Sequence, residues 1–230
     1  RAGQWWISVA IGGAVIAISM GPPQALSALR EAVAMGVDDA RLISDRAYAG
    51  SDTWATSFIL AEAIRRLPAA DLVICGERAT DGDTGQVGPA IASWLDLPLA
   101  SYVSGLEEVS GQRCRLRRLL ETGHELVELD LPGLLTVVKE AADPRLPTLQ
   151  GKRRARTLAI PVLNQETLKL PPQACGLEGS PTRVVRIFRP RVARSCELVA
   201  CAGAEGAQGA AESLCRFLRQ RRTSPGESMG

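Results

Sequence analysis

Residues 76–87, GERATDGDTGQV, gather glycines, acidic side chains and a hydroxyl in one short stretch. Gly82, Gly85 and nearby Gly88 permit positive φ angles and close approach of the backbone to a ligand. Thr84 adds a hydroxyl donor and acceptor. These residue types in this order are typical of a loop that wraps an anionic or hydroxyl-rich group.

The surroundings of this loop indicate which group it would hold. The apolar run at 71–75 predicts a buried parallel strand before it, and Gln86–Pro89 predicts the start of a helix after it. The amides at a helix start favour an anion, so a phosphate fits there. Asp81 and Asp83 would repel a phosphate, and we expect them to accept ribose hydroxyls, cap the helix or brace the turn.

Residues 76–87 lack the motifs of two common nucleotide-binding sites. They have neither the glycine–lysine spacing of a P-loop nor the G-x-G-x-x-G dinucleotide fingerprint. An Asp-Gly turn without a ligand is the alternative that the residues alone leave open.

Histidine and cysteine chemistry is not indicated. The single histidine, His124, lies in an alternating stretch without a partner for a triad, and is expected to be a solvated or hairpin residue. The six cysteines contain no C-x-x-C pair, and Cys75 falls inside the predicted buried strand. We interpret them as free thiols in a reducing compartment, which makes the expected location cytoplasmic.

Charge and hydropathy exclude two further classes of partner. Lys plus Arg is 27 against 25 Asp plus Glu, a balance too even to indicate a nucleic-acid-binding protein. The uncharged segment 5–20 is shorter than the roughly 20 residues that a membrane-spanning helix needs, so we expect buried strand and no membrane insertion.

The pattern of elements predicts an α/β fold with a mostly parallel twisted sheet and helices on both faces. Strands are expected at 14–19, 40–44 and 71–75. Helices are expected at 22–35 and from Ser51 or Asp52 to about 67, the second with Trp54 on its buried side. The runs at 101–106, 112–119 and 125–131 predict a small antiparallel section, and 134–138 is expected to rejoin the main sheet.

Beyond Asp143 the sequence becomes irregular and basic, with arginines recurring to residue 194. Such runs are usually solvated faces, and partner docking is the alternative. A terminal amphipathic helix is expected at 207–219, followed by a frayed polar tail. Three parts are thus predicted: an α/β domain at 13–142, a loop with a basic extended arm at 143–195, and a terminal helix and tail at 196–230.

Four blocks of sequence together resemble one family, the β subunit of electron-transfer flavoprotein. They are GERATDGDTGQVGPAIA at 76–92, ISMGPPQALSALREAVAMGVDDARLISDRAYAGSDTWATS at 18–57, DPRLPTLQGKRRAR at 143–156, and GLEGSPTRVVRIF at 176–188. The resemblance runs in the right order from about Gly13 to the terminal helix. Its loop is similar to the bacterial and electron-bifurcating type.

This resemblance implies a sheet of the adenine-nucleotide-binding hydrolase-like type with a cofactor groove at its loops. The groove would hold AMP or, in bifurcating members, a second FAD beside an NADH site. The cofactor-binding residues implied are Met20, Gly21, Gly76, Glu77, Arg78, Ala79, Thr80, Asp81, Gly82, Asp83, Thr84, Gly85, Gln86 and Val87. Redox chemistry then belongs to the flavin, and no residue is expected to act as a general acid, base or nucleophile.

The resemblance also implies partners. The chain would pair with an electron-transfer flavoprotein α subunit, with which it shares FAD, and dock on an acyl-CoA or related dehydrogenase. The segment 144–156 is similar to the family's recognition loop, with Leu149 as apolar anchor beside Lys152, Arg153 and Arg154. The chain is thus expected to be an electron-carrier subunit rather than a stand-alone enzyme.

The beginning of the chain departs from the family. Residues 1–12, RAGQWWISVAIG, match none of the strand and turn that family members carry upstream of 14–19, so the chain resembles a truncated or altered member. We expect residues 5–10 either to replace that strand or to leave a sheet edge open, with weakened nucleotide binding and a tendency to aggregate.

Two other functions are possible for this kind of fold. An AMP- or ATP-binding sensor of the same fold has no need of the 143–156 segment or of the Gly-Ser-Pro-Thr-Arg block at 179–183. An ATP pyrophosphatase would want a Ser-Gly-Gly loop after the first strand, and Ser-Met-Gly-Pro-Pro-Gln stands at 19–24 instead.

Overall fold

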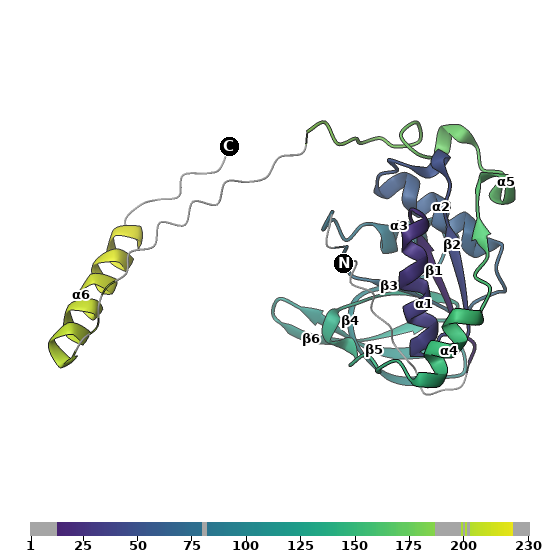
Figure 1. Cartoon of the computed structure of the whole chain (residues 1–230). Helices are drawn as coiled ribbons and strands as arrows, with labels where there is room; N and C mark the ends of the chain where they lie inside the picture. Colours follow the sequence, from purple (N-terminus) through teal and green to yellow (C-terminus); the bar gives the residue numbers. More distant parts are fainter. Residues whose placement is uncertain (1–12, 80–81, 187–198, 200, 202, 223–230) are drawn as a thin grey trace. The chain divides into compact units, whose positions relative to one another are not determined.

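The computed structural model describes residues 13–79, 82–186, 199, 201 and 203–222 (Figure 1). The segment 5–10 lies outside these residues, and so does the tail from 223. The chain divides into two units, Arg1–Val184 and Val185–Gly230, and each is treated by itself.

The first unit opens with a βαβ unit. Strand β1 (Ile16–Met20) pairs in parallel with β2 (Asp39–Ile43), and helix α1 (Leu26–Met35) connects them after a short 3₁₀ turn, η1 (Pro23–Ala25). Helix α1 ends because Gly36 adopts φ +117°, a left-handed conformation that glycine allows at no steric cost. The short strand β8 (Val162–Leu163) adds to the other edge of β2, which gives the sheet order β1-β2-β8.

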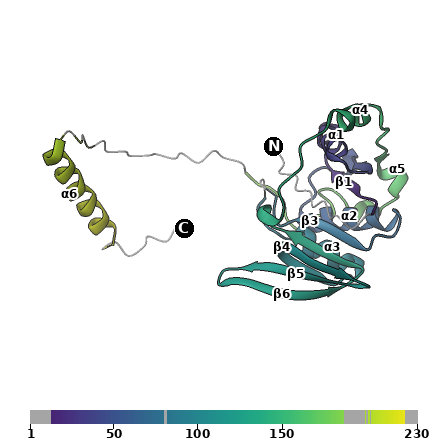
Figure 2. The same cartoon turned by 90° about the horizontal axis from the view of Figure 1, so that it is seen from below.

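Helices cover both faces of this three-stranded sheet, as the alternation of its side chains requires. Ala17 and Leu42 pack with α1 and with α4 (Leu149–Thr157) on one face. Ile43 points the other way and packs with α2 (Thr53–Arg65). Figures 1 and 2 show α1 and α4 side by side.

The second sheet has five strands in the order β3-β7-β4-β5-β6. Strand β7 pairs in parallel with both β3 and β4, whereas β4, β5 and β6 form antiparallel pairs, visible together in Figure 2. Helix α3 covers one face at Leu134 and packs against α2. The bounds are β3 Leu72–Gly76, α3 Val87–Leu95, β4 Leu99–Ser110, β5 Arg113–Leu120, β6 Gly123–Asp130 and β7 Gly133–Val137.

The α/β fold with parallel strands, helices on both faces and a small antiparallel section is confirmed, and β7 rejoins the parallel strands as expected. One arrangement differs from the expectation of a single main sheet. Strands β1 and β3 are both edge strands, and no described strand pairs with their outer edges. Helix α2 joins the two sheets, because Ile59 packs over β2 while Leu60 and Ile64 pack with α3.

The connections after β7 contain more regular structure than the sequence indicates. The prediction of irregular structure beyond residue 143 is wrong for α4, whose Thr148 side chain accepts a hydrogen bond from Gly151 N. Short turns complete this unit: η2 (Arg46–Tyr48), η3 (Lys139–Ala141), α5 (Gln165–Leu168) and η4 (Pro172–Ala174).

In the second unit the expected terminal helix is confirmed as α6 (Gly203–Arg222), which extends beyond the predicted bounds at both ends. Its apolar residues Leu214, Phe217 and Leu218 are exposed. Among the helices that the structure describes, none has the length and apolar character needed to cross a membrane.

Candidate functional site

The predicted strand, loop and helix around residues 76–87 are all present, but the prediction of a buried strand is wrong: β3 lies at the sheet edge, is only partly buried, and leaves Ile74 37% exposed. Strand β3 ends at Gly76, and α3 begins at Val87. Between them Asp83 donates its N–H to the carbonyl of Ala79, and its carboxylate lies 3.6 Å from Arg78 Nε. Asp83 therefore braces the loop, and the nearby guanidinium offsets its negative charge.

The three glycines of this region serve different purposes. Gly85 adopts φ +64°, and a Cβ there would lie 3.4 Å from the carbonyl oxygen of Glu77. Gly88 lies inside α3, where a Cβ would come within 2.5 Å of Thr136 Cγ2. Among the described residues, and apart from its chain neighbours, no heavy atom lies within 4 Å of a Cβ placed on Gly82. Gly85 thus permits the turn, Gly88 lets α3 approach β7, and Gly82 leaves open space.

The N-cap residue of α3 bonds to α2 instead of capping its own helix. Gln86 occupies the N-cap position, but its side chain makes no capping bond. Its Oε1 instead accepts a hydrogen bond from Thr53 Oγ1 at 3.1 Å, which ties the loop to the start of α2. Because the side chain of Gln86 does not cap α3, it leaves the amides of the first turn to other partners, and an anion is a partner that such amides favour.

The other predicted cofactor-binding residues are placed as follows. Met20 and Gly21 end β1 in the three-stranded sheet, where Gly21 N–H donates to the carbonyl of Ile43, so they do not share a sheet with the loop. Thr80 and Asp81 lie outside the described residues. In the loop Gly76, Arg78, Ala79, Gly82, Asp83, Thr84 and Gln86 are exposed, and Glu77, Gly85 and Val87 are half-buried.

Two residues that the sequence did not indicate complete the surroundings of the loop. Tyr102 of β4 brings its hydroxyl to 4.0 Å from the Cβ position of Gly85. Thr136 of β7 is 3% exposed and contacts the position of Gly88. Tyr102 falls in a run of alternating strand residues, where nothing in the pattern distinguishes it from an ordinary surface residue.

The start of α2 is fixed by a distant segment. Asp52 caps the helix, as expected, by accepting hydrogen bonds from Trp54 N and Ala55 N through Oδ1. Its Oδ2 accepts from both the backbone N and the hydroxyl of Thr182. Trp54 itself is 53% exposed, contrary to the prediction of a buried position, although its ring makes an edge contact with that of Trp94.

The predicted docking residues lie on or beside α4. Leu149 is 71% exposed, and Lys152 and Arg153 are exposed next to it. Arg154 differs from them, because its guanidinium donates to the backbone carbonyls of Val37 and Asp38. Leu149, Lys152 and Arg153 are thus free to meet a partner, while Arg154 fastens α4 to the turn before β2.

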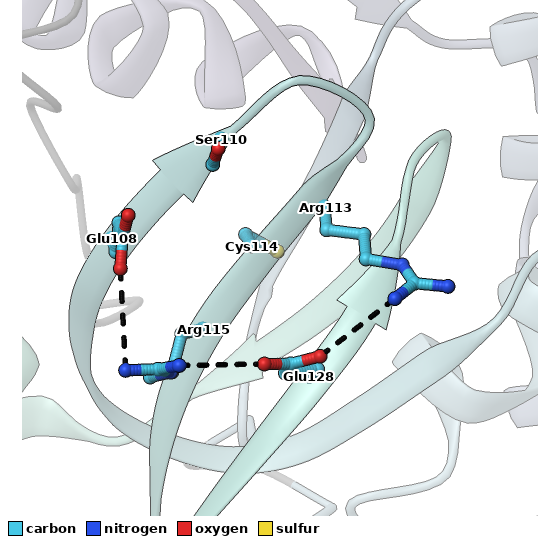
Figure 3. Close-up of a pocket in the computed structure, with 6 residues that line it drawn as sticks. All are labelled: Glu108, Ser110, Arg113, Cys114, Arg115 and Glu128. Carbon is cyan, nitrogen blue, oxygen red and sulfur yellow. Dashed lines mark hydrogen bonds and ion pairs between the residues drawn. The ribbon is translucent and has the colours of Figure 1, made fainter.

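A shallow hollow of about 290 Å³ lies elsewhere, on the antiparallel strands (Figure 3). Its charges are satisfied among themselves, since Arg115 lies 4.0 Å from Glu108 and 3.5 Å from Glu128, which in turn lies 3.9 Å from Arg113. The hollow is therefore a charged strand surface and not the predicted cofactor site.

Thiol and metal chemistry receives no support from the described residues. Burial raises the pKa of Cys75 to about 11, which keeps that thiol protonated at neutral pH. His124 is exposed on the β5–β6 hairpin, as expected. The part of the chain that the structure describes has no group of three His, Cys, Asp or Glu residues able to hold a metal ion.

The fold and the exposed glycine loop define an α/β protein with parallel strands and an anion-compatible loop between β3 and α3. The electron transfer flavoprotein domain matches residues 7–168, and the chain belongs to this family. The match begins within the segment 1–12, earlier than the resemblance by sequence motifs indicated.

Relatives agree with this assignment. The chain is 45% identical over 188 residues to the caffeyl-CoA reductase-Etf complex subunit CarD of Acetobacterium woodii, covering 82% of this chain and 71% of the relative. It is 43% identical over 205 residues to an electron transfer flavoprotein subunit beta of Thermoanaerobacterium thermosaccharolyticum, covering 89% and 78%. It is 42% identical over 186 residues to the acryloyl-CoA reductase electron transfer subunit gamma of Anaerotignum propionicum, covering 78% and 69%.

These findings give the chain a flavin-related role in electron transfer and do not favour the sensor alternative. An α-type partner subunit and redox partners are implied by the same family.

Proposed function

We propose that this chain is the β-type subunit of a two-subunit electron carrier and binds an adenine nucleotide, either AMP or the adenylate part of FAD, over residues 76–87. The observation that carries the proposal is the strand–loop–helix geometry: the side chain of the N-cap residue Gln86 does not cap α3, and the preceding Gly85 is in left-handed conformation. When bound, a flavin would supply the redox chemistry, and NADH is the electron donor expected in a bifurcating carrier.

The residues present fit such a group. The α3 amides and the open space at Gly82 can accept a phosphate. Asp83 is held by Arg78, which leaves it to brace the loop rather than repel the ligand. Thr84 and Gln86 are exposed and can donate hydrogen bonds to ribose or phosphate oxygens.

The redox partners are proposed to dock on helix α4. Leu149 supplies an exposed apolar anchor, and Lys152 and Arg153 supply charge that would steer an acidic partner surface. The names of two relatives include caffeyl-CoA reductase and acryloyl-CoA reductase, which supports an acyl-CoA or related dehydrogenase as partner. A cytoplasmic location is proposed from the free thiols of Cys75, Cys114 and Cys175.

The nucleotide site is tested by calorimetric titration of AMP and of FAD into the full chain and into its complex with an α subunit. Gly85→Ala should weaken nucleotide binding, because a side chain is strained at φ +64°. Gly111→Ala is the matched control, since Gly111 has φ +58° in the β4–β5 turn, where no atom lies within 4 Å of its Cβ position. Equal affinity of Gly85→Ala and Gly111→Ala would refute this site.

Docking is tested by the rate of electron transfer from an acyl-CoA dehydrogenase to the two-subunit carrier. Leu149→Ala should slow this rate, while Leu126→Ala, which truncates a leucine 64% exposed on β6, should leave it unchanged. A carrier that tolerates Leu149→Ala as well as Leu126→Ala would exclude α4 from the interface.

A further inference from the structure

Tyr102 has a backbone conformation that its residue type rarely adopts. Its φ is +57°, in the left-handed region, where side chains other than glycine, asparagine and aspartate are uncommon. It lies in an irregularity of the β4–β7 pairing, between Ala100 and Val103. Strained residues of this kind persist only where their surroundings fix them, and they gather at ligand sites.

The surroundings fix Tyr102 from both sides. Its N–H donates to Thr136 Oγ1 at 3.1 Å, and Thr136 is 3% exposed in β7. The carbonyl of the preceding residue, Ser101, accepts a hydrogen bond from Arg118 Nε at 2.8 Å. Val103 then returns to regular pairing with Val137. The two neighbouring strands therefore hold the bulge in place.

The bulge places the phenol of Tyr102 near the loop between β3 and α3. The sheet order β3-β7-β4 separates Tyr102 from the loop by one strand, yet its hydroxyl lies 4.0 Å from the Cβ position of Gly85. Tyr102 remains 42% exposed. The phenol of a β4 residue thus lies beside Gly85 of the loop, where the nucleotide is proposed to bind.

From this geometry we infer that Tyr102 is a ligand-contacting residue, whose hydroxyl donates a hydrogen bond to a phosphate oxygen of the nucleotide held by residues 82–88. The inference rests on the proposed function and adds a specificity-determining residue to it. A hydroxyl beside Gly85, the residue before the N-cap of α3, would add a donor for the anion proposed at this helix start.

The test compares AMP with adenosine in calorimetric titrations of the full chain. Tyr102→Phe should weaken AMP binding about tenfold and leave adenosine binding unchanged, since only AMP carries the phosphate. Tyr48→Phe is the matched control, because Tyr48 is the chain's other tyrosine and its hydroxyl is buried without a hydrogen-bond partner in the described structure.

A second readout separates contact from an effect on folding. The chain has two tyrosines, so labelling with 3-fluorotyrosine gives two ¹⁹F resonances, assigned through the two phenylalanine variants. AMP should shift the Tyr102 resonance and leave that of Tyr48 in place. The inference requires both the affinity loss and this shift.

The outcomes also separate the inference from the proposed function. AMP binding that is equally tight in Tyr102→Phe, or that leaves the Tyr102 resonance unmoved, overturns the inference while the proposed site stands. If the unmodified chain and its complex with an α subunit bind neither AMP nor FAD, the proposed nucleotide site is overturned and the role of Tyr102 with it.

Discussion

Asp52 and Thr182 are 130 residues apart in sequence and directly bonded in the structure. Asp52 Oδ2 accepts hydrogen bonds from Thr182 N at 2.9 Å and from Thr182 Oγ1 at 2.7 Å, while the other carboxylate oxygen caps α2. Ser180 Oγ adds a bond from Asp52 N at 2.8 Å. One carboxylate thus both starts a helix and holds the segment after η4.

Removing this carboxylate should destabilise the fold measurably. Asp52→Ala loses a helix cap and two long-range bonds, and we expect a loss of about 2 kcal/mol in urea unfolding. Thr182→Val should cost about 1 kcal/mol, and the double variant less than the sum, because the two changes remove one shared bond. Asp130→Asn, at an exposed ion pair with Arg113, is a control expected to change little. Additive losses at Asp52 and Thr182 would contradict the coupling.

The same carboxylate predicts a pH dependence. Burial acts to raise the pKa of Asp52, but hydrogen bonds from Thr182, Ala55 and Trp54 outweigh it and lower the pKa below its ordinary 3.8. A group whose pKa is lower when folded contributes stability above its unfolded pKa and loses it as pH falls through the folded value. The stability difference between the unmodified chain and Asp52→Asn should therefore be full at pH 7 and shrink below 3.8. A constant difference down to the pH of acid unfolding would contradict this assignment.

The approach of α3 to β7 gives a steric prediction. Gly88→Ala places a Cβ 2.5 Å from Thr136 Cγ2, and we expect a destabilisation of about 2 kcal/mol despite the better helix propensity of alanine. Thr136→Ser removes the methyl group that clashes and keeps the hydroxyl that Tyr102 N–H uses. Adding Thr136→Ser to Gly88→Ala should hence restore most of the loss in thermal unfolding. Failure of this rescue would place the conflict elsewhere, for instance at Cys75 Cβ, 3.3 Å from the same position.

Two neighbouring arginines of α4 should behave differently. Arg154→Ala removes bonds to the carbonyls of Val37 and Asp38 and should cost about 1.5 kcal/mol in urea unfolding. Arg153→Ala should leave stability within about 0.5 kcal/mol, because that side chain is exposed. Electron-transfer rates, compared at equal folded fraction, should show the opposite order. Arg153→Ala should lower the rate more than Arg154→Ala. Equal stability of the two variants would show that Arg154 does not fasten α4.

Much of the fold could be predicted because local signals agree with it. Gly36 ends α1, Asp52 caps α2, and the alternating runs after residue 100 become antiparallel strands. Helix α4 could not be predicted from an apolar pattern, because its sequence is rich in basic residues and only Ala155 is buried. It packs through a glycine instead: a Cβ on Gly151 would lie 2.1 Å from the carbonyl oxygen of Ala34. A helix that packs in this way has no periodic apolar residues from which it could be predicted.

At the site, the sequence identified the loop but not its neighbours. Gly85 and the α3 start follow from residue types and spacing. The approach of Tyr102 and the bond between Thr53 and Gln86 depend on strand order and on a bulge, which are long-range properties. The split into two sheets likewise depends on which strands pair with each other. The alternation of side chains along one strand does not determine this pairing.

The bond between Asp52 and Thr182 also has a consequence for synthesis of the chain. A ribosome makes the polypeptide from its N-terminus, so Asp52 emerges 130 residues before the partner that completes its hydrogen bonds. Until Thr182 has left the exit tunnel, Asp52 Oδ2 lacks its two donors from Thr182, next to Thr53, whose hydroxyl donates to Gln86 of the nucleotide loop. The start of α2, to which the loop is bonded, therefore gains this support only after the segment beyond η4 has been synthesised and closes onto α2.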